Sequence, residues 1–247
     1  MTGLIDLADA RAVLARAHRH YREYNEAIHG TGLSTLWDHR ESFDGKSEEW
    51  FYSISIERDR LVAAKPILAD AATNVTSALD HVIAAIAKAT GAERKGLFFP
   101  RVDVENFNGD LANAAKKIGD DMAKVLASAR EKRVHETSHV AAAREIANSG
   151  KHWELPLSEG SLSAVALPIP GQAQRIFDIP TDAFSASNVH EYYRGRERLP
   201  NLGRYLVVRL EILGLSAGLP GAPDSIFECS FRFADAMISA VENTEHV

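Results

Sequence analysis

The chain has 247 residues, of which 45% are hydrophobic and 25% are charged, and its net charge is −6. This composition is typical of a folded globular protein, and the negative charge argues against a surface that binds nucleic acid or anionic membranes over its whole area. Cys229 is the single cysteine, which excludes an intramolecular disulfide and a thiolate metal cluster.

The N-terminal residues do not predict export. Asp6 and Asp9 lie where a signal peptide needs a basic start and an apolar run. No apolar stretch approaches the ~20 residues that are required to span a bilayer. We therefore expect a cytoplasmic protein with no membrane partner.

The first half of the chain is expected to be mainly helical. Residues 3–29 carry apolar side chains at alternating three- and four-residue spacings, which predicts an amphipathic helix that packs on a helix of the same chain or of a second copy. Residues 51–56 alternate with period two and predict a strand. A long helix follows over residues 66–90, because the proline is suited to a first helical turn and Gly91 to a C-cap. Shorter helices are expected over 104–130 and 137–149.

Beyond about residue 155 the pattern changes from helical to extended. Four alternating or β-branched runs are separated by proline, glycine and asparagine clusters, and they cover residues 161–169, 175–179, 189–193 and 204–213. They predict an antiparallel meander, to which the strand at 51–56 can add. Residues 225–243 are expected to return to a helix.

The predicted fold class is α+β. Residues 1–153 form a mainly helical domain, and residues 154–247 form a β-rich extension that ends in a helix. We expect the two parts to pack as one unit.

A polar stripe interrupts the apolar long helix. Asp70, Asn74, Ser77 and His81 recur at spacings of four, three and four, so they share one face, and Asp80 flanks it. Most other residues of this helix are aliphatic, so we expect this face to be partly buried and hydrogen-bonded. A histidine beside an aspartate favours a tuned imidazole pKa. The stripe is therefore interpreted either as a hydrogen-bond network that fixes helix register or as part of a site.

Residues 135–139 read His-Glu-Thr-Ser-His, a match to H-E-x-x-H. On a helix, His135 and His139 lie one turn apart and can bind Zn²⁺, while Glu136 acts as general base on the bound water. Thr137 is a good N-cap residue, however, and the apolar helical pattern begins only at Val140. We therefore expect no metal site, and a zinc-dependent hydrolase is kept as an alternative.

Lys151 and His152 follow Gly150, where the preceding helix is expected to end. Cations interact favourably with a helix C-terminus, so a charged cap is one interpretation. The other is that both side chains project from the helix end towards the polar stripe. In that case they belong to the same site as His81.

Three motifs in this part of the chain occur together. Residues 74–81 contain Asn-x-x-Ser-Ala-Leu-Asp-His, residues 99–100 are Phe-Pro, and residues 148–152 are Asn-x-x-Lys-His. In order and spacing they resemble a large family of uncharacterised bacterial and phage proteins. Members of that family have an Asn-Leu-Arg-Ser-Ala-Leu-Asp-His helix, then Phe-Pro, then Asn-Ile-Asp-Lys-His. The resemblance covers roughly residues 50–155.

The arginine and histidine of the family's first motif resemble the Arg-x4-His signature of higher-eukaryote-and-prokaryote nucleotide-binding (HEPN) domains. Many of those are metal-independent ribonucleases of toxin or phage-defence systems, and they typically act as dimers. The resemblance implies HEPN-like helices, an RNA or nucleotide ligand, a homo-oligomer and no cofactor. It also implies a site with His81 as general acid/base, supported by Asp80, Lys151 and His152, and with binding residues Asn74, Ser77 and Asn148.

This chain departs from the family pattern at two positions. Thr76 stands at the motif arginine, and Gly150 stands at the aspartate before Lys-His. Loss of the arginine removes a group expected to stabilise charge developing on phosphorus. Either another cation replaces it, with Lys151 the first candidate, or the protein is not a nuclease. A further alternative is a non-catalytic module that dimerises through the apolar stripe of residues 7–28.

Overall fold

The structure is a computed structural model that describes residues 5–29, 36–151, 163–166, 176–177, 187–199, 206–212 and 214–246. The chain forms two compact units that alternate along the sequence. The first consists of Met1–Glu23, Pro66–Pro156 and Leu215–Val247, and the second of Tyr24–Lys65 and Leu157–Gly214. Helices dominate the first unit and strands the second, so the α+β prediction is confirmed.

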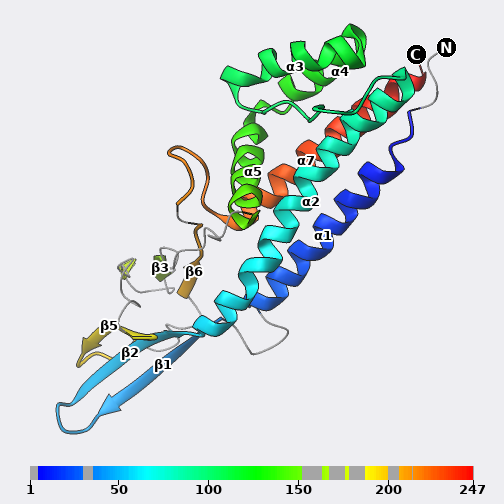
Figure 1. The fold of residues 1–247 in the computed structure, drawn as a ribbon. Coiled ribbons are helices and arrows are strands. Elements are labelled where there is room, and N and C mark those ends of the chain that lie inside the picture. The colour runs from blue at the N-terminus through cyan, green and yellow to red at the C-terminus, as the bar shows by residue number, and fades with distance from the viewer. Residues whose placement is uncertain are drawn as a thin grey trace. The chain divides into compact units, whose positions relative to one another are not determined.

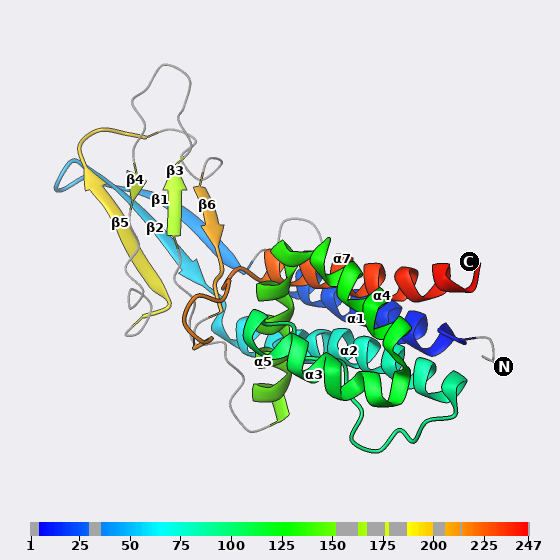
Figure 2. The same ribbon diagram turned by 90° about the horizontal axis from the view of Figure 1, so that it is seen from above.

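The described helices account for most of the first unit (Figure 1). They are α1 (Ala8–His29), α2 (Arg58–Thr90), α3 (Val104–Ile118), α4 (Asp120–Glu131), α5 (Thr137–Lys151) and α7 (Pro223–Glu242), with 3-10 turns η1 (Val134–Glu136) and η2 (Asn243–His246). Within this unit α1, α2 and α7 lie side by side in both views (Figures 1 and 2). Of the helices described, none is both long enough and apolar enough to cross a membrane.

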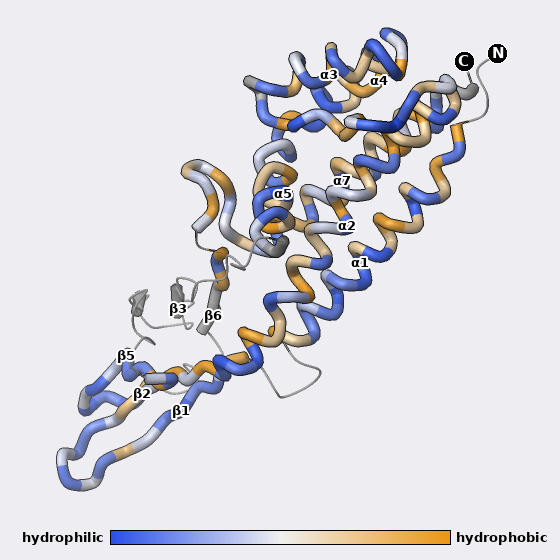
Figure 3. The backbone as a smooth tube through the Cα atoms, in the orientation of Figure 1, coloured by the Kyte–Doolittle hydropathy of each residue, from blue (hydrophilic) through white to orange (hydrophobic). Residues whose placement is uncertain are grey.

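The apolar stripe of α1 is buried within this chain. Leu7, Leu14 and Tyr21 are each less than 9% exposed, and the Tyr21 ring stacks on Phe227 of α7 with the ring centroids 4.6 Å apart. Of the two partners that the sequence left open, the structure therefore provides one in the same chain. Hydrophobic residues recur along α1, α2 and α7 at helical spacing (Figure 3).

The long helix begins before the expected proline. α2 starts at Arg58, and Pro66 lies inside it. A proline within a helix leaves the carbonyl four residues earlier, here that of Val62, without a helical donor. Val62 is exposed, so water can reach this part of the helix. The helix therefore tolerates the proline without ending there.

The second unit contains two antiparallel sheets of three strands among its described residues. The first has the order β1-β2-β5 and is built from β1 (Trp37–Asp44), β2 (Glu49–Ile56) and β5 (Val189–Gly195). The second has the order β4-β3-β6 and is built from β3 (Ser163–Ala166), β4 (Ile176–Phe177) and β6 (Leu206–Arg209). The strand predicted at 51–56 does join the 189–193 run. The other three runs pair separately instead of extending the same meander.

A histidine–tyrosine pair in the first sheet gives a pH prediction. Nε2 of His39 lies 2.6 Å from the hydroxyl of Tyr192. Burial lowers the pKa of His39, against the opposing effect of Glu41 and Asp38, and burial raises the pKa of Tyr192. The tyrosine hydroxyl therefore donates and the neutral imidazole accepts.

Because the folded-state pKa of His39 lies below its ordinary value of 6.5, the unfolded chain binds the proton more readily. Stability contributed by this pair is present above pH 6.5 and is lost as the pH falls through the folded-state pKa. We expect the free energy of unfolding, measured in urea, to be lower at pH 5.5 than at pH 7.5, with less than about 1 kcal/mol of the difference coming from this pair. His39→Gln should lower stability at pH 7.5 and make this difference smaller. An unchanged pH difference in the variant would contradict the assignment.

Candidate functional site

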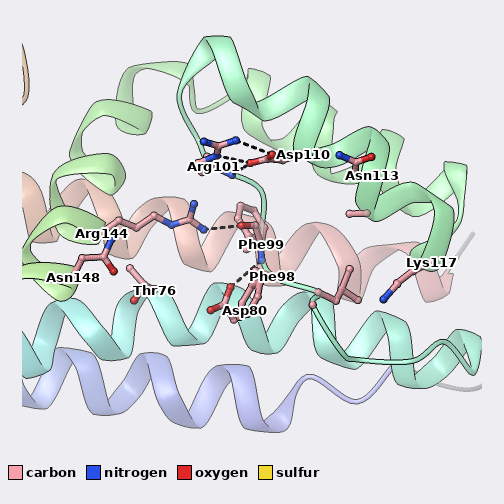
Figure 4. A pocket seen from close by; sticks show the side chains of 13 residues that line it. Thr76, Asp80, Phe98, Phe99, Arg101, Asp110, Asn113, Lys117, Arg144 and Asn148 are labelled. Carbon is pink, nitrogen blue, oxygen red and sulfur yellow. Dashed lines mark hydrogen bonds and ion pairs between the residues drawn. The ribbon is translucent and has the colours of Figure 1, made fainter. Parts of the chain in front are cut away.

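A pocket of about 620 Å³ lies within the helical unit, between α2, α3, α5 and the connection from α2 to α3. We call residues 96–101 of that connection the Phe-Pro segment, since it contains the Phe-Pro motif. Figure 4 shows the side chains that line the pocket. They are Thr76, Asp80, Gly96, Leu97, Phe98, Phe99, Arg101, Asp110, Asn113, Ala114, Lys117, Arg144 and Asn148.

The Phe-Pro segment is held in place by its backbone and by one of its two aromatic rings. Oδ1 of Asp80 accepts a hydrogen bond of 2.8 Å from the backbone N–H of Phe99. The Phe99 ring is buried and meets Phe233 of α7 edge to face, with centroids 6.2 Å apart. The preceding residue, Phe98, is 69% exposed. The Phe99 ring thus anchors the segment, and the exposed Phe98 ring lines the pocket.

Arg144 of α5 is a desolvated cation of this pocket. Its guanidinium donates to the backbone carbonyl of Phe99 at 2.9 Å (Figure 4) and to that of Pro100 at 3.1 Å. Burial lowers the pKa of Arg144, and Asp80 and Asp110 oppose that shift. Arginine stays protonated in proteins, so the group remains a cation. Within the described ranges no carboxylate forms an ion pair with it, and neutral carbonyls orient its charge without cancelling it.

The other cations of the pocket are held in two different ways. Arg101 forms a two-pronged ion pair with Asp110, at 2.8 and 3.1 Å, and its backbone N–H donates to the same carboxylate at 3.1 Å. Lys117 instead donates from Nζ to the backbone carbonyl of Lys95 at 2.7 Å. The lining therefore combines three cations with two carboxylates, Asp80 and Asp110. Its positive charge is concentrated on Arg144 and Lys117.

The sequence prediction placed only part of this site. Asp80 and Asn148 both line the pocket, and so does Thr76, whose hydroxyl donates to carbonyls of its own helix. The other predicted residues of α2 (Asn74, Ser77 and His81) are half-buried but are not among the pocket-lining residues. Nδ2 of Asn74 donates to the carbonyl of Asp70 in the same helix at 2.7 Å.

The predicted pair at the end of α5 falls at the limit of the described residues. Lys151 is the last residue of the helix, and His152 lies outside the described residues. Their role in a shared site with His81 stays a prediction. Arg144 was not predicted, although it lies one helical turn before Asn148 and so shares its face of α5. The four-residue spacing from Asn148 is the sequence signal that could have identified Arg144.

The His-Glu-Thr-Ser-His residues make contacts of their own. The 3-10 turn η1 contains His135 and Glu136, and α5 begins at Thr137. The buried carboxylate of Glu136 accepts from Arg133 and from Arg232 of α7, both at 3.2 Å. Nε2 of His139 lies 2.8 Å from the hydroxyl of Ser225. In the described part of the chain, no three His, Cys, Asp or Glu side chains are grouped so that they could hold a metal ion.

Comparisons of this chain with protein-family models, with curated proteins and with solved structures gave no match.

Proposed function

We propose that the pocket between α2, α3 and α5 binds a nucleotide or the phosphate end of an RNA strand, with Arg144 as the cation that holds the phosphate. The observation that carries this proposal is the desolvated guanidinium of Arg144, which neutral carbonyls orient. Arginine has five N–H donors in a planar fork, and two backbone carbonyls do not exhaust them. A phosphate oxygen is a suitable acceptor for those that remain.

The exposed ring of Phe98 favours a nucleotide over a simple anion. It lines the same pocket as Arg144, and a flat aromatic surface stacks on a nucleobase whatever the base sequence. The volume of about 620 Å³ lies within the range of pockets that take small organic ligands. Aromatic stacking and phosphate contacts together suit a ligand with a base at one end and a phosphate at the other.

This proposal accounts for the position at which the chain departs from the family pattern. Thr76 stands at the motif arginine position, and it lines the same pocket as Arg144. We infer that α5 supplies the guanidinium which α2 lacks in this chain, so that a HEPN-like phosphate site is kept. No histidine is among the lining residues that the structure describes. Binding is therefore better supported than hydrolysis.

Arg144→Gln is expected to weaken nucleotide binding by about 10- to 100-fold. A hydrogen bond to a charged group contributes about 1.5–3 kcal/mol, and each 1.4 kcal/mol is a tenfold change in affinity. The measurement is titration calorimetry or fluorescence anisotropy with a 5′-phosphorylated oligoribonucleotide and with AMP. Arg144→Lys keeps the charge but not the planar fork, so its affinity should lie between those of the wild type and of Arg144→Gln.

The matched control is Arg19→Gln, because Arg19 is an exposed arginine of α1 in the same unit. It removes the same charge, and it should leave binding unchanged. Thermal unfolding of each variant verifies that the fold is kept. Equal affinity of the wild type, Arg144→Gln and Arg19→Gln proteins would contradict the proposal.

Phe98→Ala tests the contact with the base separately from the contact with the phosphate. Base stacking on an aromatic side chain contributes about 1–3 kcal/mol, so AMP should bind roughly tenfold or more weakly to this variant. Inorganic phosphate should bind as it does to the wild type, because the contacts of Arg144 are retained. A parallel loss for AMP and phosphate would show that Phe98 acts through pocket structure and not through a base.

A further inference from the structure

A serine and a histidine are hydrogen-bonded to each other away from the pocket. Ser225 lies in the first turn of α7 and His139 in the first turn of α5, and Oγ of Ser225 lies 2.8 Å from Nε2 of His139. Both side chains are half-buried, so each keeps some exposure to solvent. This is the distance at which a histidine base accepts the proton of a serine nucleophile.

The other side of the imidazole is also held. His139 has a hydrogen bond with the backbone of His135, and the Ser138 hydroxyl lies 3.4 Å from Nδ1 of His139. In the neutral ring, the tautomer with its proton on Nδ1 leaves Nε2 to accept from Ser225. Burial lowers the pKa of His139, and the charge of Arg232 acts in the same direction, so the ring is neutral at pH 7. A neutral ring with a free Nε2 lone pair is the state that a general base requires.

The start of α7 supplies donors next to the serine. Its N-cap, Ala222, makes no side-chain cap, and the first backbone N–H with a helical acceptor is that of Ile226, which donates to Ala222. The N–H groups of Asp224 and Ser225 precede it and have no acceptor within the helix. Such donors stabilise the oxyanion that develops on a carbonyl oxygen when a serine oxygen attacks the carbonyl carbon. The first turn of α7 thus carries both the serine and two backbone donors, and α5 supplies the histidine.

We propose that Ser225 and His139 form a nucleophile–base pair that cleaves small carboxylic esters. Oγ of Ser225 attacks the ester carbonyl carbon while its proton passes to Nε2 of His139. The bond to the alcohol oxygen then breaks, and the departing alcohol takes that proton. Water next attacks the acyl-serine with His139 as base, which releases the carboxylic acid and returns the proton to Ser225. Ester and water are converted into acid and alcohol, with no further reactant.

The full chain should be treated with a fluorophosphonate probe, digested and mapped by mass spectrometry, and its hydrolysis of p-nitrophenyl acetate should be followed by absorbance. We expect an adduct on Ser225 and a hydrolysis rate that falls about 100-fold or more in Ser225→Ala, because the variant lacks the oxygen that forms the acyl intermediate and so makes no use of the positioned base, which contributes about 10²- to 10⁴-fold. His139→Gln should lose both the adduct and the hydrolysis. Ser225→Ala removes only one half-buried hydroxyl, so it keeps the test decisive if the histidine variant does not fold.

Ser128→Ala is the matched control, because Ser128 is an exposed serine of α4 in the same unit. It should hydrolyse the ester at the wild-type rate and carry the probe on Ser225 as the wild type does. The proposal is overturned if Ser225 carries no more probe than Ser128 in the wild-type protein. It is also overturned if Ser225→Ala hydrolyses the ester at the wild-type rate. Neither result bears on nucleotide binding at Arg144, which rests on different residues.

Discussion

Phe233→Ala is expected to lower the free energy of unfolding by about 3–5 kcal/mol, the usual cost of truncating a fully buried phenylalanine. Phe233 is 0% exposed in α7. Its ring also meets Phe99 edge to face, a geometry that contributes about 0.5–1.5 kcal/mol beyond burial. Urea unfolding followed by circular dichroism at 222 nm, a wavelength standard for helix, gives the measurement.

The neighbouring exposed ring is the natural control. Phe98 is 69% exposed, so Phe98→Ala should change the free energy of unfolding by less than about 0.5 kcal/mol. Phe233→Leu keeps most of the buried apolar volume, and its cost should be smaller than that of alanine. If Phe98→Ala and Phe233→Ala cost the same, the division of the two aromatic rings between core and pocket is wrong. A large effect of Phe233→Ala on nucleotide affinity is also expected, because Phe99 carries a carbonyl that orients Arg144.

The helical unit was accessible from the sequence because its signals are local. The periodic apolar face of α2 and the apolar run of α7 each predict a helix from neighbouring residues alone. In the same region Phe227, Cys229, Phe231 and Phe233 alternate with period two, which is also typical of a strand. The structure explains this pattern, because Phe227 and Phe231 share one face while Phe233 adds to a wide apolar surface. The ends of the helices were harder to predict, since local rules place Pro66 in a first turn but it lies inside α2.

The strand β1 was not predicted, for a physical reason. Its sequence, Trp-Asp-His-Arg-Glu-Ser-Phe-Asp, is mostly charged or polar, and all of its side chains are exposed or half-buried. Its strand conformation depends on pairing with β2, from Trp37 opposite Ile56 to Asp44 opposite Glu49. An edge strand with polar residues has little apolar alternation, so the sequence pattern does not predict a strand here.

Residues of the candidate site could be predicted only where a sequence motif contained them. Asp80 and Asn148 were found through the family resemblance, and both line the pocket. Arg144 was missed because its partners are the carbonyls of Phe99 and Pro100, far away along the chain. Backbone carbonyls have no sequence signature at all. The histidine predicted as general acid/base, His81, shares a helix with Asp80, but neighbouring helical residues point in different directions. Proximity in the motif therefore did not mean proximity in the pocket.

Asp80→Ala is expected to lower both stability and nucleotide affinity. The change removes the acceptor of the buried Phe99 N–H, and leaving a buried donor unsatisfied costs about 1–3 kcal/mol. The Phe-Pro segment also loses a tether, and its carbonyls no longer hold Arg144 in one orientation. We expect AMP affinity to fall about tenfold or more, as measured by calorimetry beside a urea unfolding curve.

Asp80→Asn distinguishes a structural carboxylate from one whose charge acts on the ligand. Asparagine keeps an oxygen that can accept from Phe99 N–H, so stability should be largely retained. Removing the negative charge beside Arg144 should leave AMP affinity equal to or higher than that of the wild type, because Asp80 no longer opposes the phosphate charge. Asp70→Ala, at an exposed position of the same helix, should change neither quantity. A loss of affinity in Asp80→Asn as large as in Asp80→Ala, without a loss of stability, would assign the carboxylate itself to the ligand and contradict its role as a tether.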